Sequence, residues 1–163
     1  MASAGNQDVT LRAVTRDNFE AVTDLALHPH QRAWLASNSY SIAQASFHPN
    51  FHTRAIYLDE EPIGFMMFVA LDGVDDAPGE YGIWRFMVDH RHQGKGHGRR
   101  ALQSLLDEIR RDPVACKVWI SYVPGNDTAS AFYASFGFVE TGLDEEGEMV
   151  ALLDLRPAGI AAA

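Results

Sequence analysis

The sequence predicts an α/β fold in which helices cover the faces of a mixed β-sheet. Segments with apolar residues at every second position alternate with segments whose apolar residues recur every three or four positions. These strand and helix patterns follow one another in the order β-αα-ββ-β-α-β-α-β-β. The 163 residues, 47% of them hydrophobic, fit a single domain, 1–163, whose core at about 9–155 needs no disulfide or metal.

The first third of the chain predicts one strand and two helical regions. Asp17 can cap the first helix, because Glu20 stands at the capping-box position. Pro29 ends that helix, since the residue before a proline disfavours helical geometry. The expected elements are a strand at 9–14, a helix from 17 to 28, and a helical region at 31–47 that breaks near Ser37.

The middle of the chain predicts a hairpin followed by another strand. Residues 63–71 form the longest apolar run, which Gly64 interrupts and which is too short to span a bilayer. The turn residues at 59–62 separate this run from a shorter strand pattern. The expected elements are strands at 54–58, 63–71 and 80–89, with a loop at 72–79.

The last third predicts two helices, one on each side of a strand, and a final hairpin. Ala101, Leu105 and Ile109 fall on one face of the first helix, and Gly137 closes the second as a C-cap. The expected elements are helices at 96–111 and 126–136, a strand at 115–122, and hairpin strands at 138–141 and 148–155.

The charge and the cysteine content exclude several classes of protein. Lys and Arg number 13 and Asp and Glu number 22, so the net charge is −9, which would repel nucleic acid and anionic membranes. A single cysteine, Cys116, can form no intrachain disulfide. Residues 1–8 lack the pattern of a signal peptide, and we expect a cytoplasmic protein. The seven histidines have no matching ligands, so no metal site is expected.

A glycine-rich loop precedes the helix at 96–111. Closely spaced glycines let backbone N–H groups approach an anion, and the start of a helix adds unpaired donors and a partial positive charge. Basic side chains gather in the same stretch although the chain as a whole is acidic. These features predict a site for a pyrophosphate-bearing ligand. The segment reads Gln93, Gly94, Lys95, Gly96, His97, Gly98, Arg99 and Arg100.

Three phosphate-binding motifs compete for this loop. The P-loop pattern G-x-x-x-x-G-K-[ST] is not satisfied. The dinucleotide pattern G-x-G-x-x-G fails because Arg99 stands at the third glycine, and 114–121 offers no acidic residue for a ribose. The acetyl-CoA pattern Q/R-x-x-G-x-G/A matches in full at Gln93, Gly96 and Gly98. A solvated turn remains an alternative for the loop taken alone.

A second motif follows at 126–138, where the sequence reads NDTASAFYASFGF. Together with the loop, it resembles the GNAT superfamily of N-acetyltransferases, whose signature there is N-x-x-A-x-x-x-Y-x-x-x-G-F. The resemblance covers about residues 9–155. Within the superfamily, the segments 37–45 and 80–87 resemble the bacterial spermine/spermidine (diamine) acetyltransferase group.

The resemblance implies a GNAT fold, with a mostly antiparallel sheet of about seven strands, about four helices, and a V-shaped slot between the fourth and fifth strands. Acetyl-CoA would lie there, its pantetheine arm pairing with the backbone of Phe86, Met87 and Val88. Gln93 to Arg99 would hold the pyrophosphate, and Asn126 would bind the pantetheine arm. An exposed N–H of the fourth strand would stabilise the oxyanion, as preorganised donors do.

Tyr133 is the catalytic residue that the resemblance implies. Its hydroxyl would protonate the departing thiolate, because a phenol has a reference pKa of about 10 and a thiol of about 8.5. Packing against the sheet is the alternative role, since positions 132, 133 and 136 are all aromatic.

The acceptor side is less well defined by the sequence. By period two, Glu80 shares a strand face with Gly82, Trp84, Phe86 and Val88. Glu80 lies about 26 Å from Val88 along a strand, too far for direct proton abstraction. No other general base is evident from the sequence.

Aromatic and polar residues of the helical region at 31–47 could bind a cationic amine, although ordinary helix packing explains them equally well. The candidate acceptor residues are Trp34, Asn38, Tyr40, Glu80 and Trp84. We expect transfer of an acetyl group to a small primary amine, with polyamines favoured. Another amine, such as an antibiotic, a protein terminus or a lysine, and a non-catalytic acyl-CoA sensor are the alternatives. GNAT relatives are often dimers, which allows a homodimer.

Overall fold

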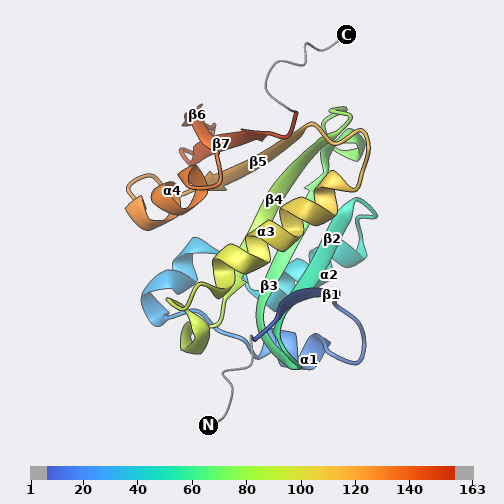
Figure 1. The fold of residues 1–163 in the computed structure, drawn as a ribbon, viewed down its shortest axis with the longest axis vertical. Coiled ribbons are helices and arrows are strands. Elements are labelled where there is room, and N and C mark those ends of the chain that lie inside the picture. Colours follow the sequence, from blue (N-terminus) through green and yellow to red (C-terminus); the bar gives the residue numbers. More distant parts are fainter. Residues whose placement is uncertain (1–6, 157–163) are drawn as a thin grey trace.

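The computed structural model describes residues 7–156 as one seven-stranded mixed sheet with helices on both faces (Figure 1). The strand order is β1-β2-β3-β4-β5-β7-β6. The predicted α/β class is confirmed. The strands are β1 (Val9–Ala13), β2 (Phe51–Leu58), β3 (Glu61–Ala70), β4 (Glu80–Val88), β5 (Lys117–Tyr122), β6 (Val139–Leu143) and β7 (Met149–Asp154), and the helices are α1 (Phe19–Thr23), α2 (Asn38–Ser46), α3 (His97–Arg110), α4 (Asp127–Ala134) and the 3₁₀ helices η1 (Pro29–Trp34), η2 (Leu71–Gly73) and η3 (His90–His92).

The sheet separates two apolar cores. On one face, α3 buries Leu102, Leu105 and Ile109, each at most 2% exposed, and Figure 1 shows this helix lying across β3 and β4. On the other face, Val22 from α1 packs with Phe65 from β3. Full burial of one such side chain stabilises the fold by about 1.5–3 kcal/mol. The two cores hold β4 between them, and β4 forms one wall of the site described below.

The sheet opens between β4 and β5. These strands are parallel, and their pairing runs only from Glu80 opposite Lys117 to Ile83 opposite Ile120. Within residues 7–156, β4 has no strand partner on that side beyond Ile83. Figure 1 shows β5, β6, β7 and α4 diverging there from the remaining strands. The predicted splay is confirmed.

A β-bulge interrupts β4 just beyond this opening. Met67 of β3 pairs with Arg85, but the next residue, Phe68, pairs with Ile83. Trp84 is therefore an extra residue that has no partner in β3. A bulge of this kind shifts the alternation of side chains by one position.

The bulge makes one expectation from the sequence wrong. Simple alternation placed Glu80, Gly82, Trp84, Phe86 and Val88 on one face of the strand. Phe86 and Val88 instead pack with the core that contains α3, whereas Trp84 packs with the core that contains α1 and α2. The acceptor candidate Trp84 thus lies on the opposite face from the two residues next to the expected pantetheine arm.

The N-terminal helices differ in detail from their predicted form. Asp17 does not cap α1, because the N-cap is Asn18, whose side chain instead accepts a hydrogen bond from Thr15 N at 2.8 Å. The predicted break near Ser37 is confirmed. Ser37 caps α2 by accepting a hydrogen bond from Tyr40 N at 3.1 Å, and η1 precedes it.

Candidate active site

A cavity of about 950 Å³ occupies the opening between β4 and β5. Its walls come from β4, β5, α4 and η1, so segments far apart in the sequence meet around it. Figure 1 shows η1 and α4 on the open side of the sheet. The lining includes eight of the predicted site residues, namely Trp34, Trp84, Phe86, Met87, Val88, Gln93, Asn126 and Tyr133.

Along the unpaired edge of β4, the N–H and C=O groups of every second residue point into this cavity. Asp89 N donates to Ile63 O at 2.7 Å, so the peptide groups of Asp89 point toward β3. In an antiparallel pair the direction alternates, so the groups of Met87 also point toward β3, and those of Phe86 and Val88 point into the cavity. Phe86 and Val88 therefore supply the backbone edge, while Met87 is buried in the core with α1 and α2.

The glycines of the loop have the backbone geometry that only glycine adopts readily. Gly94 has a φ of 73° and Gly96 a φ of 81°, in the left-handed region. Gly96 is the N-cap of α3, so the first N–H groups of that helix are directed at the loop. Gly98 lies against Phe86 and Val88, 3.6 and 3.7 Å from where a Cβ would stand. The arrangement can accept an anion without a side chain in the way.

The basic side chains of the loop make different contacts. Arg99 donates to Ser135 Oγ at 2.6 Å and lies 4.9 Å from the Phe136 ring centroid, which ties α3 to the end of α4. Lys95 Nζ donates to Arg91 O at 3.2 Å. His97 is buried, and burial lowers its pKa, with a smaller effect from Arg100, so its side chain is neutral at pH 7. The His97 side chain therefore adds no positive charge to the loop at pH 7.

Tyr133 projects from α4 into the main cavity although it is 8% exposed. Its ring stacks on Tyr122 with centroids 5.7 Å apart. Burial, and secondarily Tyr122, raise the pKa of Tyr133 well above its usual value, so the hydroxyl stays protonated. Within residues 7–156, this hydroxyl makes no hydrogen bond. A hydroxyl that stays protonated and has no internal partner is available to donate a proton.

Asn126 forms the N-cap of α4 and borders the main cavity. Its Oδ1 accepts from Ala129 N at 3.1 Å, which fixes the side chain at the helix start. An asparagine amide still carries two N–H donors. The cap therefore orients a donor group at the cavity wall.

A model of the acetyltransferase (GNAT) family matches residues 19–138, which is most of the chain. The chain belongs to this GNAT family. It is an enzyme that uses acetyl-CoA to acetylate an amine. No helix within residues 7–156 combines the length and apolarity needed to cross a membrane.

Three relatives illustrate the range of acceptors within the GNAT family. The chain is 28% identical to the spermine/spermidine N(1)-acetyltransferase of Bacillus subtilis, with 90% of this chain and 99% of the relative covered. It is 25% identical to the aminoglycoside N(6')-acetyltransferase type 1 of Klebsiella pneumoniae, covering 94% and 86%. It is 31% identical to the [ribosomal protein bS18]-alanine N-acetyltransferase of Escherichia coli K12, covering 72% and 76%.

Solved structures agree with the GNAT fold. The aminoglycoside acetyltransferase AAC(6')-Ib, solved with paromomycin and acetyl-CoA, superposes with a TM-score of 0.76 at 19% identity, covering 90% of this chain and 93% of that one. The PaiA N-acetyltransferase of Thermoplasma acidophilum, solved with coenzyme A, gives 0.68 at 13% identity, covering 90% and 99%. At these identities the likeness shows the fold alone.

A second cavity, of about 720 Å³, lies beside the main one. Trp84, Arg85, Glu146 and Glu148 are among the residues that line both, so the two spaces adjoin. Gly82 leaves room for the Trp84 indole, because a Cβ there would stand 2.9 Å from Nε1. Carboxylates outnumber cations in the wall of the second cavity, which contains Asp75, Glu80, Asp144, Glu146 and Glu148, one arginine, Arg85, and the aromatic residues Trp84 and Trp119.

Two acceptor candidates lie outside both cavities. Asn38 is buried, and its Nδ2 donates to Val22 O at 3.0 Å and contacts Met87 Sδ at 3.7 Å, which ties α2 to α1 and β4. Tyr40 is 59% exposed on α2. The structure thus brings Trp34, Trp84 and Glu80 to the cavities and leaves Asn38 and Tyr40 outside. Within residues 7–156, no three potential metal ligands gather, and a metal-free site stays a prediction.

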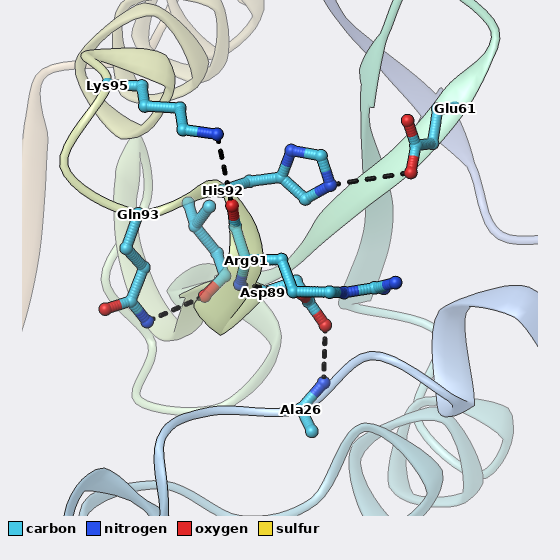
Figure 2. A network of polar contacts seen from close by, with 8 residues as sticks. Ala26, Glu61, Asp89, Arg91, His92, Gln93 and Lys95 are labelled. Atoms are coloured by element: carbon cyan, nitrogen blue, oxygen red, sulfur yellow. Dashed lines mark hydrogen bonds and ion pairs between the residues drawn. The ribbon is translucent and has the colours of Figure 1, made fainter.

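Asp89 is a site-organising residue that the sequence reasoning missed. It follows β4 and is 1% exposed. Its carboxylate accepts hydrogen bonds from Ala26 N at 3.0 Å and from Arg91 N and Nε at 3.0 and 2.8 Å, as Figure 2 shows. Burial opposes ionisation, but these bonds outweigh it and lower the pKa of Asp89 to about 2. An aspartate directly after a strand is typical of an Asx turn, and this pattern could have identified Asp89 from the sequence.

Proposed function

We propose that the acceptor is a linear polyamine such as spermidine or spermine, acetylated at one primary amine. The acidic second cavity beside the slot is the observation that carries this proposal. The Bacillus spermine/spermidine acetyltransferase, aligned over nearly its whole length, supports it. Acetyl-CoA lies in the main cavity, with its pyrophosphate at the glycine loop and its pantetheine arm along Phe86 and Val88.

The carboxylates of the second cavity differ in their availability. Glu80 already accepts from Trp119 Nε1 at 2.7 Å and pairs with Lys117 at 3.4 Å. Glu146 and Glu148, in contrast, make no ion pair and no side-chain hydrogen bond within residues 7–156. A distal ammonium group of the acceptor therefore meets Glu146 and Glu148 more readily than Glu80.

The reaction follows from this placement. The free amine attacks the thioester carbonyl, an N–C bond forms, and the oxyanion is held by a backbone N–H of the β4 edge. The C–S bond then breaks, and Tyr133 gives its proton to the thiolate. The second proton, which the nitrogen must lose to become the amide, restores the Tyr133 hydroxyl by way of solvent. The attacking ammonium must first lose a proton. Half-buried Glu148, which borders both cavities, is our candidate for the group that accepts it.

The test is kcat/KM with acetyl-CoA for spermidine, a monoamine of similar length, kanamycin, and a peptide with a free N-terminus. We expect spermidine to be preferred, and the preference to weaken with salt, because screening acts over about 8–10 Å. Equal rates with the monoamine would show that the distal charge is not recognised. Turnover of kanamycin or the peptide alone would refute the polyamine proposal. No turnover of any amine, with acetyl-CoA bound, would favour a sensor.

A further inference from the structure

Two glutamine side chains join the acceptor side of the site to the acetyl-CoA loop. Gln31 belongs to η1, and Gln93 opens the glycine loop, 62 residues further along the chain. Gln31 Nε2 donates to Gln93 Oε1 at 3.2 Å, and Gln93 Nε2 donates to Gln31 Oε1 at 3.0 Å. Each amide is therefore donor and acceptor to the other, and both residues line the main cavity.

Each glutamine is also anchored within its own segment. Gln93 Nε2 donates to Val88 O at 2.9 Å, a carbonyl of the β4 edge that faces the cavity. Gln31 Oε1 accepts from His28 N at 3.2 Å, which closes the first turn of η1. The amide pair thus connects two locally fixed backbones.

A second tie fastens the same segment at its other end. Ala26 donates to the buried Asp89 and accepts from His90 N at 2.9 Å, so the chain before η1 is fixed to the end of β4. Figure 2 shows Ala26 and Gln93 on either side of Asp89. The segment from Ala26 to Gln31 is therefore attached at one end to Asp89 and His90, after β4, and at the other end to Gln93 of the glycine loop. Trp34, which lines the cavity, follows within the same 3₁₀ helix.

We propose that Gln31 is a positioning residue that couples the two half-sites. It holds Gln93, and with it the loop, in the form that binds acetyl-CoA. In return, the loop, once ordered by acetyl-CoA, holds η1 and Trp34 against the acceptor space. Such coupling is reciprocal by linkage. The inference rests on the placement of acetyl-CoA in the proposed function and does not depend on which amine is the acceptor.

The first test is the Kd of coenzyme A, measured by calorimetry without any amine. Gln31→Ala, and Gln31→Met, which keeps the length of the side chain, should each weaken binding roughly fivefold, at the lower end of typical coupling. Gln103→Ala is the matched control, because Gln103 is exposed on α3 and its side chain bonds only Asp107. It should leave the Kd unchanged. Wild-type affinity in both folded Gln31 variants would overturn the proposal.

The second test separates coupling from mere support of the fold. Hydrogen exchange of residues 28–36 is measured with and without coenzyme A. In the wild type, coenzyme A should slow exchange there, and in Gln31→Met this ligand-dependent change should be lost. A purely structural role would speed exchange equally in both states and keep the difference, which would refute the proposal. Because neither readout uses an amine, a failed polyamine assignment leaves both results interpretable.

Discussion

On the β4 side of the slot, the groups that face a ligand are mostly backbone: the peptide edge at Phe86 and Val88, and the loop around Gly94 and Gly96. On the side of the β6–β7 hairpin, they are mostly side chains, with Glu146 and Glu148 prominent. Binding of acetyl-CoA by backbone groups requires particular residues, such as glycine, at particular positions. A carboxylate that binds the amine can instead come from many positions in the sequence. The difference explains why the acetyl-CoA half has a readable sequence motif and the acceptor half has none.

The largest effect should come from the one side chain that acts on the cofactor's leaving group. Tyr133→Phe should lower kcat by roughly 10²-fold or more, with little change in acetyl-CoA affinity. Because burial raises the pKa of Tyr133, the loss should be constant from pH 6 to 9. Steady-state rates across that range, with calorimetric Kd values, provide the check. Wild-type kcat would make Tyr133 a packing residue.

Asp89 should contribute to stability, because it fixes the end of β4 to the segment before η1. Its folded pKa of about 2 lies below the unfolded reference of about 3.9, so its contribution is present above pH 4 and is lost as the pH falls toward 2. A shift of this size corresponds to about 2–3 kcal/mol.

Asp89→Asn should therefore be less stable than the wild type at pH 7, and the difference should vanish only as the pH falls to about 2 or below, as measured by urea unfolding. Asp154→Asn is the comparison, since the pKa of Asp154 is also lowered to about 2, but by an exposed pair with Arg156 that water screens. Equal pH dependence in Asp89→Asn and the wild type would contradict this role.

Gly96→Val tests whether backbone groups of the glycine loop bind acetyl-CoA. The variant should weaken acetyl-CoA binding tenfold or more, which corresponds to about 1.4 kcal/mol. Gly147→Val is a strain-matched control in the β6–β7 turn. Both glycines have a positive φ, 81° and 83°, and neither has an atom within 4 Å of an added Cβ. If both variants bind acetyl-CoA equally, strain rather than the loop is responsible for any loss.

The smallest effect on catalysis should come from the carboxylates that line the acceptor side of the slot. Glu146→Gln should raise the KM for spermidine up to about fivefold, because an exposed ion pair is worth only about 0–1 kcal/mol. Glu145→Gln, in the same turn but outside both cavities, makes the same charge change and should have no effect. An equal rise in both variants would indicate a general charge effect rather than recognition.

Where local chemistry decides the structure, the sequence predicted most elements correctly. The apolar periodicity of α3 predicted a helix, which is confirmed, and the glycines before it predicted an anion-binding loop, which stays a prediction. Asp17 failed as a cap, since Asn18 takes the N-cap position. The role of the hairpin carboxylates Glu146 and Glu148 was not predicted, because the pairing of β5 with β7, which brings them to the slot, joins residues far apart in the sequence.

The bulge at Trp84 has a consequence for how this enzyme can change. Upstream of it, side chains near Glu80 and Gly82 form part of the acceptor wall, and downstream, Phe86 and Val88 form part of the cofactor wall. The extra residue sets which layer the upstream side chains face relative to the downstream ones. Deleting one residue at the bulge would move one group of side chains to the opposite layer. We therefore expect acceptor preference along β4 to change by substitution rather than by insertion or deletion at the bulge.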